Sequence, residues 1–591
     1  MAAGRARGSL LLRGGRVINV FSNEILTADV LIAGRLVAAV GPDLGADADE
    51  VIDLAGAHLA PGLIDGHVHL ESSLVTPEKY ADAVLPRGVT SVVCDPHEIA
   101  NVAGEQGVRW LLDATEELAL DVYVTVPSCV PSTPFETTGA DFELDAMERL
   151  LRHPRVVGVA EIMSFAAVVA GAPDVLAKAA LAASNSLPAD GHAPGLRGRA
   201  LQAYVASGIA SDHESTTLDE GLEKLRAGLF LMIREGSVSR DLANHLPLLD
   251  PRHGERIGFV TDDRLPPDLL TEGGVDHLVR SAIKAGADPA YAVRCASHNN
   301  ANHYRLARRG AVAAGFFADL VVLGDLTAFT AAAVYKDGRL VARGGELVSR
   351  PRPEASPNLH GPESDGVVDR TVRLGGLKGS AFAIAAPADG ESLLCIGASG
   401  NQLVTRRLTV NPKVENGRVI ADLDNDVLKL ACVERHGRGG GVGLGLVNGF
   451  GLRAGALASS VGHDHHNLMV VGATDADMLL ACRRLEALGG GFVIVEDGAV
   501  LSELPLPLAG LLTDAPLEDV AAALERLDAI AASLGNRLPS PFMALSFLGL
   551  AVIPKLKLTD RGLVDVERGA LVDLVAGNRG LADGGAQSPN D

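Results

Sequence analysis

The chain has 591 residues, of which 47% are hydrophobic and 21% are charged. A chain of this length exceeds what one hydrophobic core serves, so we expect two to four domains. Its net charge of −22, without a long basic tract, excludes nucleic acid as an expected partner. The six cysteines are widely spaced and the apolar run Leu10–Leu12 ends at Arg13, which predicts a cytoplasmic protein without a membrane partner, signal peptide or disulfide framework.

Short β-type runs and glycine turns alternate over residues 8–58, and this pattern predicts a small β unit. From about residue 59 to residue 305, apolar strands alternate with helical patterns such as 107–120 and 215–227. Strands buried on both faces and separated by helices indicate a parallel sheet, and eight such units are typical of a closed (β/α)₈ barrel. The eight predicted strands are Leu63–His69, Thr90–Asp95, Val122–Val126, Val156–Ile162, Leu187–His192, Gly208–His213, Leu229–Ile233 and Ile257–Asp262.

Short strands return over residues 311–350, and we expect them to complete the N-terminal β unit. A Pro-rich stretch predicts a linker, and mixed strands and helices then continue almost to the end of the chain. The prediction is therefore an α/β protein with a TIM barrel, a small β-sandwich domain from both flanks of the barrel, and an α+β C-terminal domain. The predicted boundaries are 1–58 with 311–352 for the composite β-sandwich, 59–310 for the barrel, 353–369 for the linker, 370–576 for the C-terminal domain and 577–591 for a disordered tail.

The most informative motif is His67-Val68-His69, which closes the first predicted barrel strand. Two imidazoles with one residue between them point to the same side of an extended strand, where one metal ion can bind both. Such a pair is a weak signal alone, because paired histidines also occur on ordinary surfaces. Further candidate ligands follow at the ends of other strands, and this makes the signal strong.

The C-terminal strand ends of a barrel open on one face, so polar residues placed there converge. Four imidazoles and two carboxylates can hold two divalent cations. Glu161 lies inside an apolar strand, where a carboxylate is costly unless it is paired or bound to metal. The chain thus has the features of a metal-dependent hydrolase. The predicted metal ligands are His67, His69, Glu161, His192, His213 and Asp262.

Several other polar residues have two interpretations that the sequence leaves open. Asp263 follows Asp262, and a turn or helix cap explains one of the two. His97 and Glu98 fit an active-site role and a structural role equally well, and Arg234 fits either substrate orientation or an ion pair at the barrel rim. In the C-terminal domain, a cluster between apolar flanks suits an accessory metal site, a cap over the barrel mouth or a polar turn. This cluster consists of His463, Asp464, His465, His466 and Asn467.

At these residues the chain resembles the amidohydrolase superfamily, and more closely the bacterial adenine deaminases within it. Many two-metal members bridge their cations with a carboxylated lysine from the fourth strand, whereas Glu161 stands at that position here. This substitution favours the adenine deaminases over dihydroorotase- or hydantoinase-type enzymes. The resemblance is carried by Pro-Gly-Leu-Ile-Asp-Gly-His-Val-His (61–69), Asp-Pro-His-Glu-Ile-Ala-Asn-Val (95–102), Ala-Glu-Ile-Met (160–163), Gly-His-Ala-Pro (191–194), Ser-Asp-His-Glu (211–214) and Thr-Asp-Asp-Arg (261–264).

The resemblance implies hydrolytic deamination of adenine to hypoxanthine and ammonia by a metal-bound hydroxide, as a step of purine salvage. It implies two divalent cations, with Mn²⁺ expected first and Fe²⁺ or Zn²⁺ as alternatives. Asp262 would move a proton from the hydroxide to the departing amine, and Glu161, Glu98 and Asp263 are candidate donors to the purine ring. His97 and Arg234 would orient the substrate or the metal-bound water. An enzyme of this size is expected to form a homodimer or a larger homo-oligomer.

Three other functions compete with this one. Hydrolysis of a cyclic amide, or deamination of another base, would use the same metal site, and the fold cannot decide between them. A metal-binding protein without catalysis would be expected to have lost ligands, and all the candidate ligands are present. The zinc fold of the cytidine deaminases needs a Cys-x-x-Cys pair, and the sequence has none.

Overall fold

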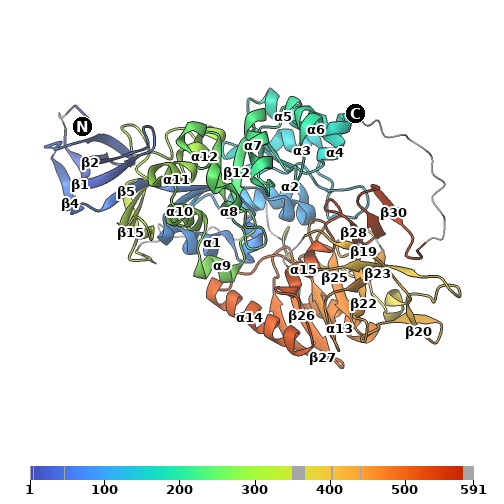
Figure 1. Cartoon of the computed structure of the whole chain (residues 1–591). Helices are drawn as coiled ribbons and strands as arrows, with labels where there is room; N and C mark the ends of the chain where they lie inside the picture. Colours follow the sequence, from blue (N-terminus) through green and yellow to red (C-terminus); the bar gives the residue numbers. More distant parts are fainter. Residues whose placement is uncertain are drawn as a thin grey trace.

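The computed structural model describes residues 2–3, 6–45, 47–348, 366–400, 403–439 and 441–576. Figure 1 shows the barrel between a β-rich region formed near the N-terminus and a second mixed region formed by the C-terminal part of the chain. The predicted tail 577–591 and most of the predicted linker, residues 353–365, lie outside the described residues.

Eight parallel strands form the barrel, and all eight overlap the strands predicted from the sequence. Five of them form one sheet and three form another. The sheets join where the Ala210 N–H donates to the Ala189 carbonyl (2.9 Å) and where the Asp262 N–H donates to the His67 carbonyl (3.0 Å). The strands are β6 (Leu63–Val68), β7 (Val89–Cys94), β8 (Asp121–Val126), β9 (Val156–Ile162), β10 (Ala189–Gly191), β11 (Ser211–Asp212), β12 (Phe230–Arg234) and β13 (Ile257–Val260).

Helices follow the strands, as in other barrels of alternating strands and helices. The helical pattern predicted for 107–120 is present over 107–114, but α2 (His97–Ala114) also contains an earlier helical segment that was not predicted. The two segments meet at a kink at Gly104, which has φ +62° and ψ −147°. The predicted strand 208–213 is shorter than expected, because Gly208 has φ +96° and forms a turn after α6. The main barrel helices are α1 (Pro77–Val84), α2, α3 (Leu144–Leu150), α5 (Pro173–Ser184), α6 (Gly198–Ala206), α7 (Leu218–Ala227) and α10 (Val275–Lys284).

Strands that precede and follow the barrel in the sequence share one sheet. Its order is β17-β16-β15-β14-β5-β1-β2-β3, with β4 paired to β1, so β5 (His58–Pro61) lies antiparallel to β14 (Leu320–Asp325). The two predicted runs at 10–12 and 17–20 form one strand, β1 (Gly8–Asn19), with a register shift between Leu12 and Gly15. The other members are β2 (Glu24–Ala33), β3 (Leu36–Gly41), β4 (Ala48–Asp53), β15 (Thr330–Lys336), β16 (Arg339–Arg343) and β17 (Glu346–Leu347).

The C-terminal region is built on an eight-stranded sheet of order β19-β18-β23-β22-β25-β24-β26-β27. Helix α13 (Asp475–Leu488) packs on this sheet, and α14 (Leu517–Ser533) lies against both the sheet and α9 (Pro266–Thr271) of the barrel. The strands are β18 (Leu393–Gly397), β19 (Arg406–Val410), β22 (Val427–Val433), β23 (Val442–Asn448), β24 (Ala456–Ser459), β25 (Leu468–Gly472), β26 (Gly491–Glu496) and β27 (Ala499–Pro505).

Smaller elements complete this region: the hairpin of β20 (Lys413–Glu415) and β21 (Arg418–Ile420), helix α15 (Pro541–Phe547), and a three-stranded sheet of β28 (Leu556–Thr559), β29 (Gly562–Asp565) and β30 (Ala570–Val572). The region contacts the barrel directly, since the Thr513 N–H donates to the Leu74 carbonyl at 2.9 Å. Among the described helices, none combines the length and the apolar character that a membrane crossing needs.

Candidate active site

Glu161, near the end of β9, is the residue around which the predicted ligands gather. Its side chain is buried, and its two oxygens face different histidines. Oε1 lies 3.6 Å from His69 Nε2, whereas Oε2 lies 2.7 Å from His192 Nδ1 and 3.3 Å from His213 Nε2. Burial raises the pKa of Glu161, but His192 and His213 outweigh burial and hold it well below the usual value. The group is therefore an ionised carboxylate between two sets of imidazoles.

His67 and His69 lie on one side of Glu161, together with Asp262 from the end of β13. Asp262 Oδ1 is 2.9 Å from His69 Nε2 and 3.5 Å from His67 Nε2. His69 Nδ1 is 2.9 Å from the Asp95 carbonyl, to which it donates, so Nε2 is the nitrogen directed at Asp262 and is the one that would bind a metal ion. The three side chains therefore lie together at the C-terminal ends of the barrel strands.

Arg234, at the end of β12, pairs with two buried carboxylates beside this cluster. It donates to both oxygens of Glu214, and its Nη1 lies 2.5 Å from Asp262 Oδ2. Burial raises the pKa of Asp262, but Arg234 above all, with His67 and His69, holds it well below the usual value. Of the two interpretations of Arg234, the structure favours the ion pair, because the guanidinium is committed to orienting these two carboxylates.

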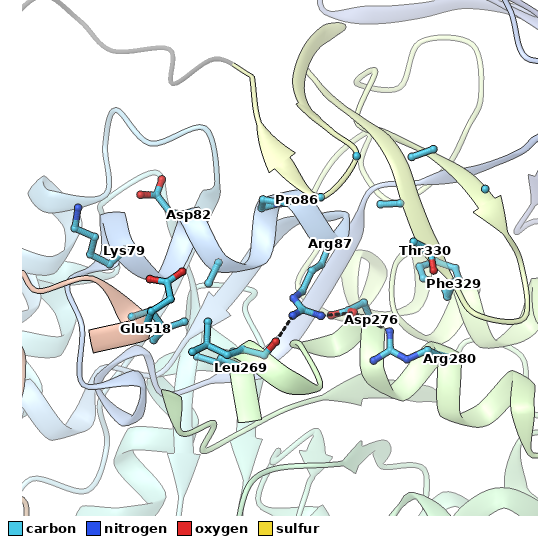
Figure 2. Close-up of a pocket in the computed structure, with 18 of the residues that line it drawn as sticks. Lys79, Asp82, Pro86, Arg87, Leu269, Asp276, Arg280, Phe329, Thr330 and Glu518 are labelled. Carbon is cyan, nitrogen blue, oxygen red and sulfur yellow. Dashed lines mark hydrogen bonds and ion pairs between the residues drawn. The ribbon is translucent and has the colours of Figure 1, made fainter. Parts of the chain in front are cut away.

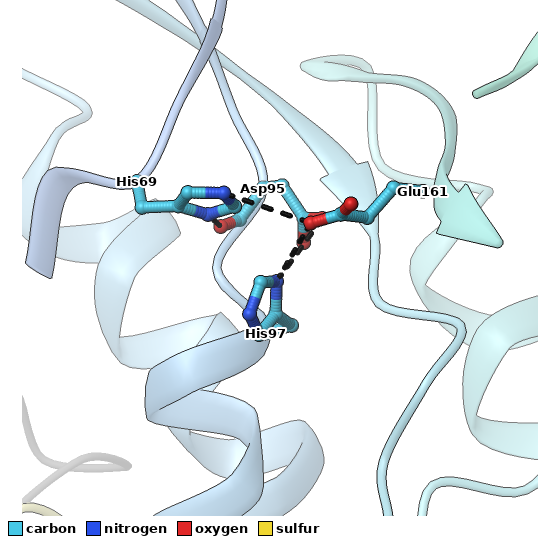
Figure 3. Close-up of side chains that lie close together, drawn as sticks. All are labelled: His69, Asp95, His97 and Glu161. Atoms are coloured by element: carbon cyan, nitrogen blue, oxygen red, sulfur yellow. Dashed lines mark hydrogen bonds and ion pairs between the residues drawn. The ribbon is translucent and has the colours of Figure 1, made fainter. Parts of the chain in front are cut away.

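His97 and Glu98 occupy the first turn of α2 and face the cavity. Figure 3 shows the His97 ring beside Glu161, His69 and Asp95. His97 Nδ1 lies 3.2 Å from Asp95 Oδ2 and 3.7 Å from Glu161 Oε1. Glu98 is buried, and burial raises its pKa. Asp95 completes this group, and the sequence offered a signal for it, since it ends the predicted strand 90–95.

Asp263 and Ser72 lie beside Glu98. Ser72 Oγ is 2.5 Å from Asp263 Oδ1 and 3.3 Å from Glu98 Oε1. Asp263 also lines the cavity, so both carboxylates of the Asp-Asp pair reach the site. Ser72 was missed in the sequence analysis, although it lies only three residues after the His67-Val68-His69 motif.

The C-terminal region supplies an apolar wall of the cavity, which the sequence analysis did not predict. Leu403, Phe547, Leu550 and Ile553 of this region line the cavity. The Phe547 ring stacks on the His463 ring, with centroids 4.7 Å apart and an interplanar angle of 12°. These four side chains are the apolar contribution of the C-terminal region to a cavity that is otherwise lined mostly by polar residues.

The predicted accessory cluster divides between the cavity and the domain core. His463 and Asp464 line the cavity, and His466 Nε2 lies 3.7 Å from Glu98 Oε2. His465 points elsewhere: its Nδ1 accepts from the Asn467 N–H at 3.0 Å, and burial lowers its pKa to about 4. His465 is thus a neutral structural residue.

A second hollow lies where α1, α9, β15 and the start of α14 meet (Figure 2). Three of its charged groups pair with one another, since Asp276 is 3.1 Å from Arg280 and 4.0 Å from Arg87. None of the predicted site residues lines it. It is a junction between domains and has no part in the site described above.

The donor set fits divalent metal ions. His67 Nε2 is buried without a hydrogen-bond partner among the described residues, and it faces Asp262. Ligand atoms lie within 4.8 Å of one another in the groups His67–His69–Asp262 and His67–Glu161–His213. Neutral imidazoles and ionised carboxylates are the ligands of Mn²⁺, Fe²⁺ and Zn²⁺ in proteins.

Comparisons with known proteins show the family of this chain. The model of the "Amidohydrolase family" matches residues 58–341, and that of the "Adenine deaminase C-terminal domain" matches residues 402–570. A protein of Kosmotoga olearia named adenine deaminase is 41% identical over 98% of this chain and 99% of its own length. One of Nitratidesulfovibrio vulgaris with the same name is 46% identical over 96% of each chain. A solved structure titled as an adenine deaminase aligns with 56% of this chain and 99% of its own at 17% identity and a TM-score of 0.44. Because relatives named adenine deaminase match nearly its whole length, this chain belongs to the adenine deaminase family of amidohydrolases.

Proposed function

We propose that this protein catalyses the hydrolytic deamination of adenine to hypoxanthine and ammonia at a binuclear metal centre. The observation that carries the proposal is the division of the Glu161 carboxylate, with one oxygen toward His69 and the other toward His192 and His213. A carboxylate so placed suits a ligand shared by two cations. The names of the full-length relatives support adenine as the substrate.

His67, His69 and Asp262 would hold one cation, and His192 and His213 the other, with Glu161 between them. Mn²⁺ is the ion we expect first, with Fe²⁺ and Zn²⁺ as alternatives. When bound, the two cations supply the Lewis acidity that activates water and polarises the substrate. The residues around them determine where the base lies and how the protons move.

Asp262 is the proposed carrier of the first proton. It would accept a proton from the attacking water and deliver it to the N6 amine as the C6–N6 bond breaks and ammonia leaves. Arg234 supports this role, because its guanidinium contacts Asp262 Oδ2 and leaves Oδ1 toward the histidines. Arg234 thus acts on the reaction through Asp262.

Glu98 is the proposed donor to the ring nitrogen N1. Burial raises its pKa, which favours the protonated acid. The contacts of Ser72 support this. A hydroxyl has one proton, and Ser72 Oγ directs it to Asp263, which is the shorter contact (2.5 Å). The longer contact with Glu98 (3.3 Å) then suits a protonated Glu98 that donates to Ser72 Oγ. After ammonia leaves, Glu98 would take back the proton of the new C6 hydroxyl, which balances the reaction. The low pKa of Glu161 disfavours Glu161 as this donor.

The apolar wall suits the flat face of a purine. Phe547 would contact the ring, with Leu550 and Ile553 beside it, while His97 and Asp263 would orient its polar edge. We further propose a cytoplasmic homo-oligomer that acts in purine salvage. The six buried cysteines, none of which forms a disulfide, support a reducing compartment.

The test uses purified protein freed of metal and reloaded with Mn²⁺. Adenine, guanine, adenosine and dihydroorotate are offered in parallel, and ammonia release is followed together with the ultraviolet shift of the purine. We expect turnover of adenine alone. Turnover of dihydroorotate without adenine would overturn the proposal and favour cyclic amide hydrolysis at the same metals.

A further inference from the structure

The segment His463–Asn467, here called the clasp turn, connects β24 to β25 and is buried throughout. The His463 N–H donates to Ser546 Oγ of α15 at 3.1 Å, and Asn467 Nδ2 donates to the Thr137 carbonyl of the barrel at 2.8 Å. His436 Nε2 lies 2.8 Å from the His465 carbonyl, to which it donates. The turn is therefore held at the boundary between barrel and C-terminal domain from both sides.

Asp464 of the clasp turn faces His97 of the barrel. Its Oδ1 lies 3.6 Å from His97 Nε2 and 3.5 Å from His463 Nδ1, and its Oδ2 is buried without a hydrogen-bond partner among the described residues. The opposite nitrogen of His97 faces Asp95 at 3.2 Å. The His97 ring is thus held between a carboxylate from each domain.

His463 and His466 face the next residue of α2, Glu98. His463 Nδ1 lies 3.9 Å from Glu98 Oε1, and His466 Nε2 lies 3.7 Å from Glu98 Oε2. The Gly462 N–H donates to His466 Nδ1 at 3.3 Å, so the proton of this neutral ring is on Nε2, directed toward Glu98. Glu98, His463 and His466 lie close enough together to hold a metal ion, and His466 Nε2 has no hydrogen-bond partner among the described residues. A protonated Nε2 cannot ligate a metal ion, however, whereas it attracts a carboxyl group 3.7 Å away, and this favours positioning over an accessory metal.

From these contacts we infer that the C-terminal domain completes the active site through the clasp turn, in which Asp464 positions His97 and His466 positions Glu98. The inference rests on the proposed function, because it concerns groups that act on adenine there. Neither Asp464 nor His466 touches the reacting atoms. Each acts through the barrel residue that it faces, so its loss should reduce kcat more than it changes KM.

The test compares Asp464→Asn and His466→Leu with wild type in the full chain loaded with Mn²⁺. Misplacement of a reacting group by about 1 Å costs on the order of 100-fold in rate, so we expect kcat for adenine to fall about 100-fold, with KM within about threefold. His466→Gln keeps an N–H donor and should recover part of the loss. His465→Gln is the matched control in the same turn: a lower melting temperature with an unchanged kcat of the folded enzyme is expected.

The outcomes separate the two proposals. If wild type does not deaminate adenine, the proposed function fails before the clasp turn is tested. If wild type is active and both variants keep its kcat, the inference is overturned. Metal content by mass spectrometry supplies a second readout: it should be the same in wild type and His466→Leu. A third equivalent of metal in wild type that disappears in His466→Leu would show an accessory metal site instead of a positioning contact.

Discussion

Glu161 Oε2 lies 2.7 Å from His192 Nδ1, although the two residues come from different strands, β9 and the end of β10. Neighbouring parallel strands place their carboxyl ends side by side, so both side chains enter the same cavity. The other oxygen of Glu161 faces His69. The carboxylate therefore links the two halves of the predicted metal centre.

Glu161→Gln should remove metal and activity together. An amide is neutral and offers one oxygen, so it cannot serve as a shared anionic ligand. We expect metal content, measured by plasma mass spectrometry, to fall from two ions per chain to one or none, and adenine turnover to be lost. Glu117→Gln makes the same chemical change at an exposed position and should keep both. Two tightly bound ions in Glu161→Gln would contradict the shared-ligand role.

Arg234→Met should lower both stability and activity. It would leave Glu214 and Asp262 as buried carboxylates without their cationic partner, and breaking a buried pair in this way costs about 3–5 kcal/mol. A large drop in melting temperature and in kcat/KM is therefore expected. Arg234→Lys keeps the charge but not the two-pronged geometry and should be intermediate. Arg197→Met breaks an exposed pair with Glu223 and should change little. Equal melting temperatures for the two methionine variants would be evidence against the role of Arg234.

The barrel half of the site could be predicted because its geometry follows from local patterns. His67, His192 and Asp262 each follow an apolar run, and a closed parallel barrel brings the ends of such runs to one face. The first segment of α2, before the kink at Gly104, was not predicted, because residues 97–103 are too few to show a helical period in the sequence. As a result, the placement of His97 and Glu98 in the first turn of a helix was missed.

The C-terminal half of the site could not be predicted in the same way. The positions of Phe547 and Asp464 depend on how one domain packs on another, and no local periodicity encodes that packing. The cluster at 463–467 was recognisable as unusual from its composition, but only the structure separates Asp464, which faces the barrel, from His465, which faces the domain core. Arg234 was ambiguous for a different reason: its partners Glu214 and Asp262 also belong to the barrel, but they follow other strands.

Phe547→Leu should weaken adenine binding with little effect on the chemical step. Aromatic stacking is worth about 0.5–1.5 kcal/mol beyond area burial, which corresponds to roughly a two- to twelvefold rise in KM. Steady-state kinetics measures this, and kcat is expected to stay within about twofold. Met543→Leu is the matched control, because Met543 packs in the same apolar cluster but does not line the cavity. An unchanged KM in Phe547→Leu would place the base elsewhere.

Lys557 should make the protein more stable as pH rises, whereas a salt-bridged lysine makes a protein less stable as pH rises. It is fully buried, donates to the Leu403 and Phe547 carbonyls at 2.8 Å each, and burial lowers its pKa to about 7. Between pH 7 and the ordinary lysine value of about 10.4, the unfolded chain binds more protons than the folded chain. Stability from this residue therefore rises with pH across that window, by up to about 1.4 kcal/mol per pH unit, and is lowest below pH 7.

Lys557→Met should remove this pH dependence. Because metal binding by histidines also varies with pH, the informative quantity is the difference in melting temperature between wild type and variant at fixed Mn²⁺. We expect the variant to lose stability relative to wild type as pH rises from 7 to 9, since only wild type gains from the neutral amine. The nearby Lys555→Met, at a half-exposed side chain, should show a constant difference. A difference for Lys557→Met that does not change with pH would mean that the buried amine titrates outside this window.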